Sequence, residues 1–170
     1  MKLNKRTTDN QNELFVVVDK DDNIIDYRTR KECHSDKNLI HRSTGVIIVN
    51  SKGEFLLQKR SQTKDLYPGY FTISCAGHVK KDESYEDAAK REMLEEIGIR
   101  VPLKFISKQL LELPVETEFD ALFTAEYDGK LNINKEEVES VEFVDPTSIL
   151  DIKDKLTPYA ILGFKRLGII

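Results

Sequence analysis

The stretch Gly77–Ile99, with the sequence GHVKKDESYEDAAKREMLEEIGI, carries more structural information than any other part of this chain. It predicts one helix with clear ends. Ser84, with Asp87 three residues later, is a capping-box pattern for a helix start. Gly98 occupies the place where a C-terminal cap is expected. The helix is therefore expected to run between Ser84 and Gly98.

Two glutamates of this predicted helix lie on its apolar side. At about 100° per residue, Glu92 and Glu96 project within roughly 20° of Tyr85. A solvated acidic face, the commoner interpretation of a charge-rich helix, would place them opposite the apolar residues. Carboxylates that face a core are costly unless a positive group meets them. Glu92, Glu95 and Glu96 have the i, i+3, i+4 spacing of oxygen ligands for a hard cation, and Mg²⁺ or Mn²⁺ suits such a set.

These residues resemble the Nudix box, Gly-x5-Glu-x7-Arg-Glu-U-x-Glu-Glu-x-Gly-U, where U is aliphatic. The chain matches every defined position, namely Gly77, Glu83, Arg91, Glu92, Met93, Glu95, Glu96, Gly98 and Ile99. The resemblance implies a loop–helix–loop metal site that hydrolyses a diphosphate joined to another group, often a nucleoside. The implied metal ligands are Glu92, Glu95, Glu96 and the Gly77 carbonyl oxygen. Arg91 is expected to pair with Glu83 or with a ligand carboxylate and to hold it in place.

The residues just before the box resemble the isopentenyl-diphosphate isomerase branch of the Nudix superfamily. The run from Leu56 to His78 matches that branch without gaps. In that branch an Arg and a Lys four residues later grip the diphosphate, and here they would be Arg60 and Lys64. A guanidinium and an ammonium both suit phosphate oxygens, whereas the alternative is that they are ordinary solvated cations at a strand end.

The same resemblance implies an alternative, second metal site. The isomerase branch uses two histidines seven residues apart, a third histidine beside the box glycine, and a downstream Glu-x-Glu. The matching residues are His34, His41, His78, Glu116 and Glu118. A lone histidine is more often a surface or hydrogen-bonded residue than a ligand, but this match uses all three histidines of the chain.

Two departures from the isomerase pattern favour hydrolysis. The isomerase cysteine that moves a proton at carbon lies two residues before the third histidine, where this chain has Ala76. Cys75 is one residue away, and in an extended segment that shift sends its side chain to the opposite face. Cys75 is therefore expected to be a buried, inert residue. Isomerases also commonly lose most box glutamates, whereas this chain keeps all of them.

The expected reaction is metal-dependent cleavage of a diphosphate linkage in a nucleoside diphosphate or triphosphate, or in a nucleoside diphosphate linked to another group. Metal ions neutralise charge on the diphosphate and help to generate the attacking hydroxide. Either Glu95 or the pair Glu116 and Glu118 takes the proton from water. The alternatives are an isopentenyl-diphosphate delta-isomerase and a non-catalytic nucleotide-binding module.

Composition limits the other possible functions. The chain has 170 residues, of which 39% are hydrophobic and 33% charged, as expected for one folded domain. Its net charge of −4 does not suggest a nucleic-acid partner. No apolar run approaches the roughly 20 residues of a membrane span, and no signal-peptide pattern opens the chain. Cys33 and Cys75 show no metal-type pairing, which indicates a reducing cytoplasm. The expected partner is a small-molecule diphosphate, and a homodimer is possible.

The remaining sequence predicts an α/β (α+β) fold. Residues 1–12 are polar and are expected to form a lead-in to a single domain at 13–170 that contains the box at 77–99. Strands are expected at 13–19, 24–28, 43–49, 54–60, 103–113, 119–127 and 138–144, with 43–49 and 54–60 forming a hairpin. Short helices are expected at 30–37 and after Asp145-Pro146, and a final helix after Thr157-Pro158. This order fits a mixed sheet covered by helices, the α/β/α sandwich that the Nudix resemblance implies.

Overall fold

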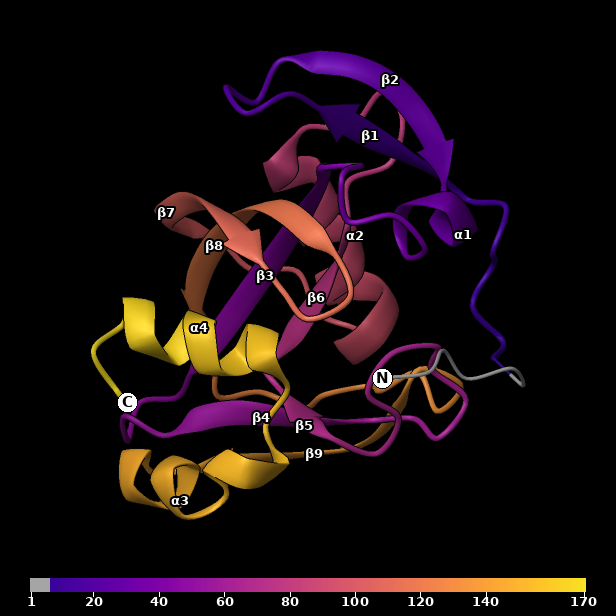
Figure 1. Cartoon of the computed structure of the whole chain (residues 1–170). Coiled ribbons are helices and arrows are strands. Elements are labelled where there is room, and N and C mark those ends of the chain that lie inside the picture. Colours follow the sequence, from indigo (N-terminus) through magenta and orange to yellow (C-terminus); the bar gives the residue numbers. More distant parts are fainter. Residues whose placement is uncertain (1–6) are drawn as a thin grey trace.

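The computed structural model describes residues 7–170, so positions 1–6 of the expected lead-in lie outside the described residues. The strands are β1 (Leu14–Val18), β2 (Ile24–Thr29), β3 (His41–Val49), β4 (Phe55–Arg60), β5 (Phe71–Thr72), β6 (Cys75–His78), β7 (Lys104–Glu112), β8 (Thr117–Glu126) and β9 (Val138–Val144) (Figure 1). The helices are α1 (Arg30–Cys33), α2 (Tyr85–Ile97), α3 (Pro146–Asp151) and α4 (Pro158–Arg166), with a 3₁₀ turn at Lys153–Lys155. No helix of this described part is long and apolar enough to cross a membrane.

The strands form one mixed sheet organised around β3. Strand β8 runs parallel to β3, from Glu118 opposite His41 to Glu126 opposite Val49. Strands β1, β4 and β6 pair with β3 in the antiparallel sense, and β9 pairs with β4. The predicted β3–β4 hairpin is reduced to the single pair Val49–Phe55. Beyond this pair the two strands diverge, because β6 pairs with the same edge of β3 and β4 pairs with β5 and β9.

The two faces of the sheet bury different clusters. Val46 and Ile48 of β3 pack with Met93 of α2. Ile47, between them in sequence, packs with Phe164 of α4 on the other side. This alternation follows from the two-residue period of a strand, and it explains the uninterrupted aliphatic run in β3. Helices α2 and α4 thus cover opposite faces (Figure 1), which confirms the predicted α/β fold with a mixed sheet.

Helix α2 has the ends that the sequence predicts. The Ser84 side chain accepts a hydrogen bond from the Asp87 backbone N–H, and the Asp87 carboxylate accepts one from the Ser84 N–H. Gly98 adopts the left-handed conformation with φ of 72° and donates its N–H to the Leu94 carbonyl. Both caps satisfy backbone groups that an uncapped helix would leave without partners.

Three elements differ from the predictions. Helix α1 ends at Cys33, because the Asp36 carboxylate accepts from the Asn38 N–H and makes a turn where further helix was expected. Strands β5 and β6 have no clear sequence pattern. Strand β6 reads Cys-Ala-Gly-His, and it is extended because it pairs with β3, from Cys75 opposite Val46 to His78 opposite Ser43.

A buried ion pair fixes helix α4 to the sheet. Asp120 of β8 is 1% exposed and accepts hydrogen bonds from Arg166 and Tyr159 of α4 and from Ser43 of β3. Removing one partner of such a pair leaves an uncompensated buried charge. We expect Asp120→Ala to lower the free energy of unfolding by about 3–5 kcal/mol in urea titrations. Asp151→Ala, at an exposed site on α3, is the control and should change it by less than about 0.5 kcal/mol. Equal losses in the two variants would contradict this account of α4.

Candidate functional site

Strand β6 and helix α2 meet at the first glycine of the box. A Cβ atom on Gly77 would lie 2.0 Å from Oε1 and 2.1 Å from Cδ of Glu92. The position requires glycine because of this close approach, since Gly77 is not among the positive-φ glycines of the described chain. The glycine lets the carboxylate of α2 lie directly against the β6 backbone.

Two carboxylates of α2 are buried beneath this strand, as their place on the apolar stripe predicts. Glu92 and Glu96 are 8% and 2% exposed. Burial, reinforced by the charge of Glu96, raises the pKa of Glu92 to about 8, and burial raises the pKa of Glu96 to about 7. One oxygen of Glu96 accepts from Gln58 Nε2 at 2.8 Å and from the Ala76 N–H at 3.3 Å. Burial and mutual repulsion disfavour the charged forms of these two adjacent carboxyl groups. A bound cation between them would restore the charged forms.

Arg91 holds the acidic residues of the box in place. Its Nε and Nη2 donate to the two carboxylate oxygens of Glu83 at 2.6 and 3.0 Å, which confirms the expected pair. Nη1 also reaches Glu92 and, at 3.2 Å, Glu95. Nη2 bonds in addition to the His78 carbonyl at 3.0 Å, so the same guanidinium joins α2 to β6. Glu95 differs from the other two glutamates in that its side chain is 45% exposed.

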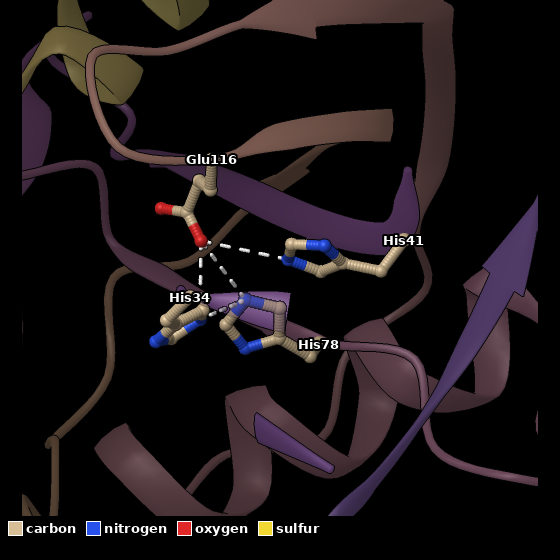
Figure 2. A group of neighbouring side chains, drawn as sticks. All are labelled: His34, His41, His78 and Glu116. Atoms are coloured by element: carbon tan, nitrogen blue, oxygen red, sulfur yellow. Dashed lines mark hydrogen bonds and ion pairs between the residues drawn. The ribbon is translucent and has the colours of Figure 1, made fainter. Parts of the chain in front are cut away.

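The three histidines of the chain gather around one oxygen of Glu116. Figure 2 shows their rings converging on Oε2, which lies 3.1 Å from His34 Nε2, 3.5 Å from His41 Nε2 and 3.7 Å from His78 Nε2. The ligand atoms of these four residues lie within 4.8 Å of one another. Glu118 Oε1 lies 3.2 Å from His78 Nε2 and 3.6 Å from His41 Nε2. The residues of the alternative metal site are therefore neighbours in space.

Strand register brings them together. His41 is opposite Glu118 in the parallel β3–β8 pair, and Ser43, two residues further along β3, is opposite His78 of β6. Residues opposite each other, and residues two apart on one strand, share a face of the sheet. Phe15 of β1 packs flat on His78, with 4.1 Å between ring centroids, and fixes the orientation of the imidazole.

The chemistry of this cluster fits a divalent metal. His34 Nδ1 contacts Asp65 at 3.1 Å and His41 Nδ1 contacts the Leu39 carbonyl at 3.1 Å, an arrangement that leaves Nε2 for a metal. His41 Nε2 and Glu116 Oε2 are both buried and make no regular hydrogen bond, although they lie 3.5 Å apart within ion-pair distance. Such orphaned atoms are rare in a folded protein, and a metal ion between them would satisfy both.

Basic residues line the cavities beside the α2 glutamates, Glu92 and Glu96, and beside the histidine cluster. Arg60 and His78 border both the cavity above α2 and the adjoining cavity beside the histidines. Lys64 lies on the α2 side, where its ammonium contacts Glu137 at 3.3 Å. The charges of Lys64 and Arg60 both lower the pKa of Glu96, although burial outweighs them. The two predicted phosphate-binding residues thus adjoin the glutamates of the box.

Sequence reasoning missed Arg30 and Glu137 in this region. Arg30 borders both cavities, and its guanidinium binds the Asp65 carboxylate at 2.7 and 3.1 Å. A signal for Arg30 was present, because it lies four residues before His34, on the same face of the predicted helix. Glu137 lies beside Lys64 in the loop before β9, and no motif marks it.

The cavity beside the histidines also has an apolar wall that the sequence did not reveal. It comes from three separate segments, the loop after β4, the turn after β7 and the start of α4, with the residues Leu66, Tyr67, Leu113, Pro158 and Tyr159. Arg30, Arg60 and Glu116 line the same cavity. The site therefore combines an apolar surface with basic side chains and the histidine cluster.

Cys75 and Ala76 lie on opposite faces of β6, as predicted. Cys75 is fully buried in the cluster with Val46 and Met93, and burial raises the pKa of its thiol well above the usual range. Ala76, opposite Gly45, borders both cavities. The chain thus presents a methyl group, and no thiol, at this point of the site.

Comparisons with known proteins agree with this architecture. Residues 39–162 match the NUDIX domain. The chain is 33% identical over 160 residues to isopentenyl-diphosphate Delta-isomerase 2 of Photorhabdus laumondii, covering 91% of this chain and 90% of that protein. It is 38% identical over 140 residues to prenyl-diphosphate phosphatase of Methanosarcina mazei, covering 78% of this chain and 79% of that protein. The fold of a Deinococcus radiodurans protein superposes with a TM-score of 0.77 at 18% identity, covering 92% and 99% of the two chains. The chain belongs to the Nudix family and is a Nudix hydrolase.

Proposed function

We propose that this protein is a divalent-metal-dependent hydrolase that splits the diphosphate group of an isoprenoid diphosphate. One observation carries the hydrolytic part of the proposal. The buried carboxylates of Glu92 and Glu96 line the same cavity as Arg60 and Lys64. A cation on the glutamates and the two basic side chains would together face a diphosphate from opposite sides.

The residues have the following roles in this proposal. Glu92 and Glu96, with the Gly77 carbonyl as a further ligand, would hold Mg²⁺ or Mn²⁺, which would supply Lewis-acid polarisation of the phosphoryl group. Arg60 and Lys64 orient the phosphates, and the missed residue Arg30 is placed to assist them. The water oxygen bonds to phosphorus and the bridging P–O bond breaks, which leaves inorganic phosphate and the monophosphate of the organic group.

Glu95 is the proposed base for the attacking water. It borders the cavity with Glu92 and Glu96 but is much more exposed than either of them. A proton that Glu95 takes from the attacking water would therefore pass easily to the solvent. The other candidates, Glu116 and Glu118, face three imidazoles and are proposed as ligands of a second metal ion with His34, His41 and His78.

The apolar wall supports the choice of substrate class. An isoprenoid chain has no polar groups to satisfy, and the wall formed by Leu66, Leu113 and Pro158 would bury it. Prenyl-diphosphate phosphatase is also the name of the relative with 38% identity. Nucleoside diphosphates, nucleoside triphosphates and nucleotide sugars, which the Nudix resemblance first suggests, are the alternative substrates.

An isopentenyl-diphosphate isomerase is the second candidate, favoured by the Photorhabdus laumondii relative. The second metal site is compatible with both functions. The orientation of Cys75 argues against isomerisation, because its thiol is enclosed in the core on the far side of β6. Ala76 at the site offers no group that could carry a proton.

A product assay tests the proposal. The protein is incubated with isoprenoid diphosphates, nucleoside diphosphates and triphosphates, and nucleotide sugars, each with Mg²⁺ or Mn²⁺, and both free phosphate and newly formed phosphomonoesters are measured. We expect release from isoprenoid diphosphates and none after metal is chelated. If only nucleotides were hydrolysed, the substrate class would be nucleotides and the isoprenoid assignment would be wrong. Conversion of the five-carbon diphosphate to its double-bond isomer without phosphate release would contradict hydrolysis.

A cytoplasmic location is part of the proposal. Cys33 and Cys75 are both free thiols and are buried in different core clusters, as in a protein that folds under reducing conditions.

A further inference from the structure

The segment that precedes β1 lies along the edge of the cavity above α2. After the grey trace in Figure 1, the chain passes beside the loop that follows β4 before it turns toward β1. The Thr8 N–H donates to the Thr63 carbonyl at 3.2 Å, and the two threonine hydroxyl groups are 3.1 Å apart. Thr8, Asp9 and Asn10 all border the cavity. The described end of the polar lead-in is therefore part of the candidate site.

Asp9 is the residue of this segment that enters the site. One of its oxygens accepts from Lys64 Nζ at 2.7 Å and lies 3.7 Å from Arg30 Nη2. The other accepts from the Asp65 N–H at 2.8 Å. Burial raises the pKa of Asp9, but the charges of Arg30 and Lys64 outweigh it and keep the carboxyl group ionised. The Asp9 carboxylate thus already contacts Lys64 and Arg30, the two cations that the proposed function assigns to the substrate phosphates.

The contacts of Asp9 are those that a phosphate oxygen would make. A carboxylate and a phosphate both accept hydrogen bonds from an ammonium, a guanidinium and a backbone N–H. The two cations also have other anionic partners, because Arg30 binds Asp65 with both of its nearer nitrogens and Lys64 contacts Glu137. Each of the two cations would therefore keep a carboxylate partner if Asp9 moved away.

The charge around the cavity makes this occupant significant. Among the described residues that border it are the basic side chains of Arg30, Arg60 and Lys64 and the acidic side chains of Asp9 and Glu137. Lys64, predicted to grip phosphate, contacts the carboxylates of Asp9 at 2.7 Å and Glu137 at 3.3 Å, and Asp9 is the closer of these two.

We propose that Asp9 competes with the phosphate groups of the substrate for Lys64 and Arg30, and that residues 7–12 move away when a diphosphate binds. Asp9 then sets the affinity of the site for diphosphates without taking part in the chemical step. The inference rests on the proposed function, because it assumes that Lys64 and Arg30 receive phosphate.

Binding of methylenediphosphonate, a diphosphate analogue with a P–C–P link that water does not cleave, tests the inference by calorimetry with Mg²⁺ present. Asp9→Asn removes the charge, whereas its amide oxygen still accepts from the Asp65 N–H. We expect Asp9→Asn to lower the Kd by about tenfold, which corresponds to about 1.4 kcal/mol. Glu86→Gln, which removes the same charge from an exposed residue of α2 paired with Lys90, should leave the Kd unchanged.

The outcomes separate this inference from the proposed function. Equal or weaker binding by Asp9→Asn would overturn the competition and would make Asp9 a positioning residue for Lys64. No binding by any of the proteins would contradict the proposed function as well. Hydrogen exchange of the wild-type protein is a second readout. Faster exchange at the Thr8 and Asp65 amides on adding the analogue supports displacement, and slower exchange there overturns it.

Discussion

Glu96→Gln is expected to reduce phosphate release by about 100-fold or more while leaving the metal-free protein at least as heat-stable as the wild type. The loss follows because the glutamine amide is a poor ligand for Mg²⁺ compared with a carboxylate. The stability follows because the amide oxygen can still accept from Gln58 and Ala76, and because one of two adjacent buried carboxyl groups is gone. Steady-state kinetics and thermal unfolding in a chelator measure the two effects.

The opposite directions of these effects make the test specific. Adding Mg²⁺ should raise the Tm of the wild-type protein more than that of Glu96→Gln, since the variant keeps only the second proposed metal site. Glu86→Gln, on the exposed side of the same helix, should retain both activity and the metal-dependent rise in Tm. Wild-type turnover by Glu96→Gln would remove Glu96 from the proposed metal site.

Gly77→Ala is expected to abolish most of the activity by moving Glu92. The added methyl group would overlap the carboxylate, which lies 2.0 Å from the position of the new Cβ. Either the Glu92 side chain leaves its place or β6 separates from α2. Overpacking of this kind costs about 1–3 kcal/mol of stability, so the variant should remain folded for assay. Activity and metal affinity are measured together with urea unfolding.

Gly163→Ala in α4 is the matched control. A Cβ there would have its nearest neighbours at 3.4 and 3.7 Å, which are ordinary contacts. Because alanine is the better helix former, this variant should gain about 0.5–1 kcal/mol and keep full activity. If Gly77→Ala were as active as Gly163→Ala, the close packing of β6 on Glu92 would not matter for function.

Helix α2 could be predicted from sequence because its determinants are local. Ser84, Asp87 and Gly98 act on the backbone within a few residues, and a helical period places Glu92 and Glu96 on the buried face. The opposite faces of Cys75 and Ala76 follow equally from the period of a strand.

The rest of the site depends on contacts between distant segments. Strand β6 has little strand pattern of its own and is ordered by pairing with β3. The histidine cluster could be predicted only from the resemblance to a family pattern. Its residues come together through the register of β3 with β8 and β6, which the local sequence does not determine. The contact of Asp9 with Lys64 joins residues 55 apart, and nothing near either residue predicts it.

The most direct test of the central claim is hydrolysis in water enriched in ¹⁸O, followed by ³¹P NMR of the products. Attack by water at phosphorus predicts an isoprenoid monophosphate and inorganic phosphate, one of which carries a new ¹⁸O on phosphorus and shows the corresponding isotope shift. Release of unlabelled inorganic diphosphate would indicate cleavage at carbon and would contradict the mechanism. A double-bond isomer with its diphosphate intact would contradict the assignment as a hydrolase of this substrate.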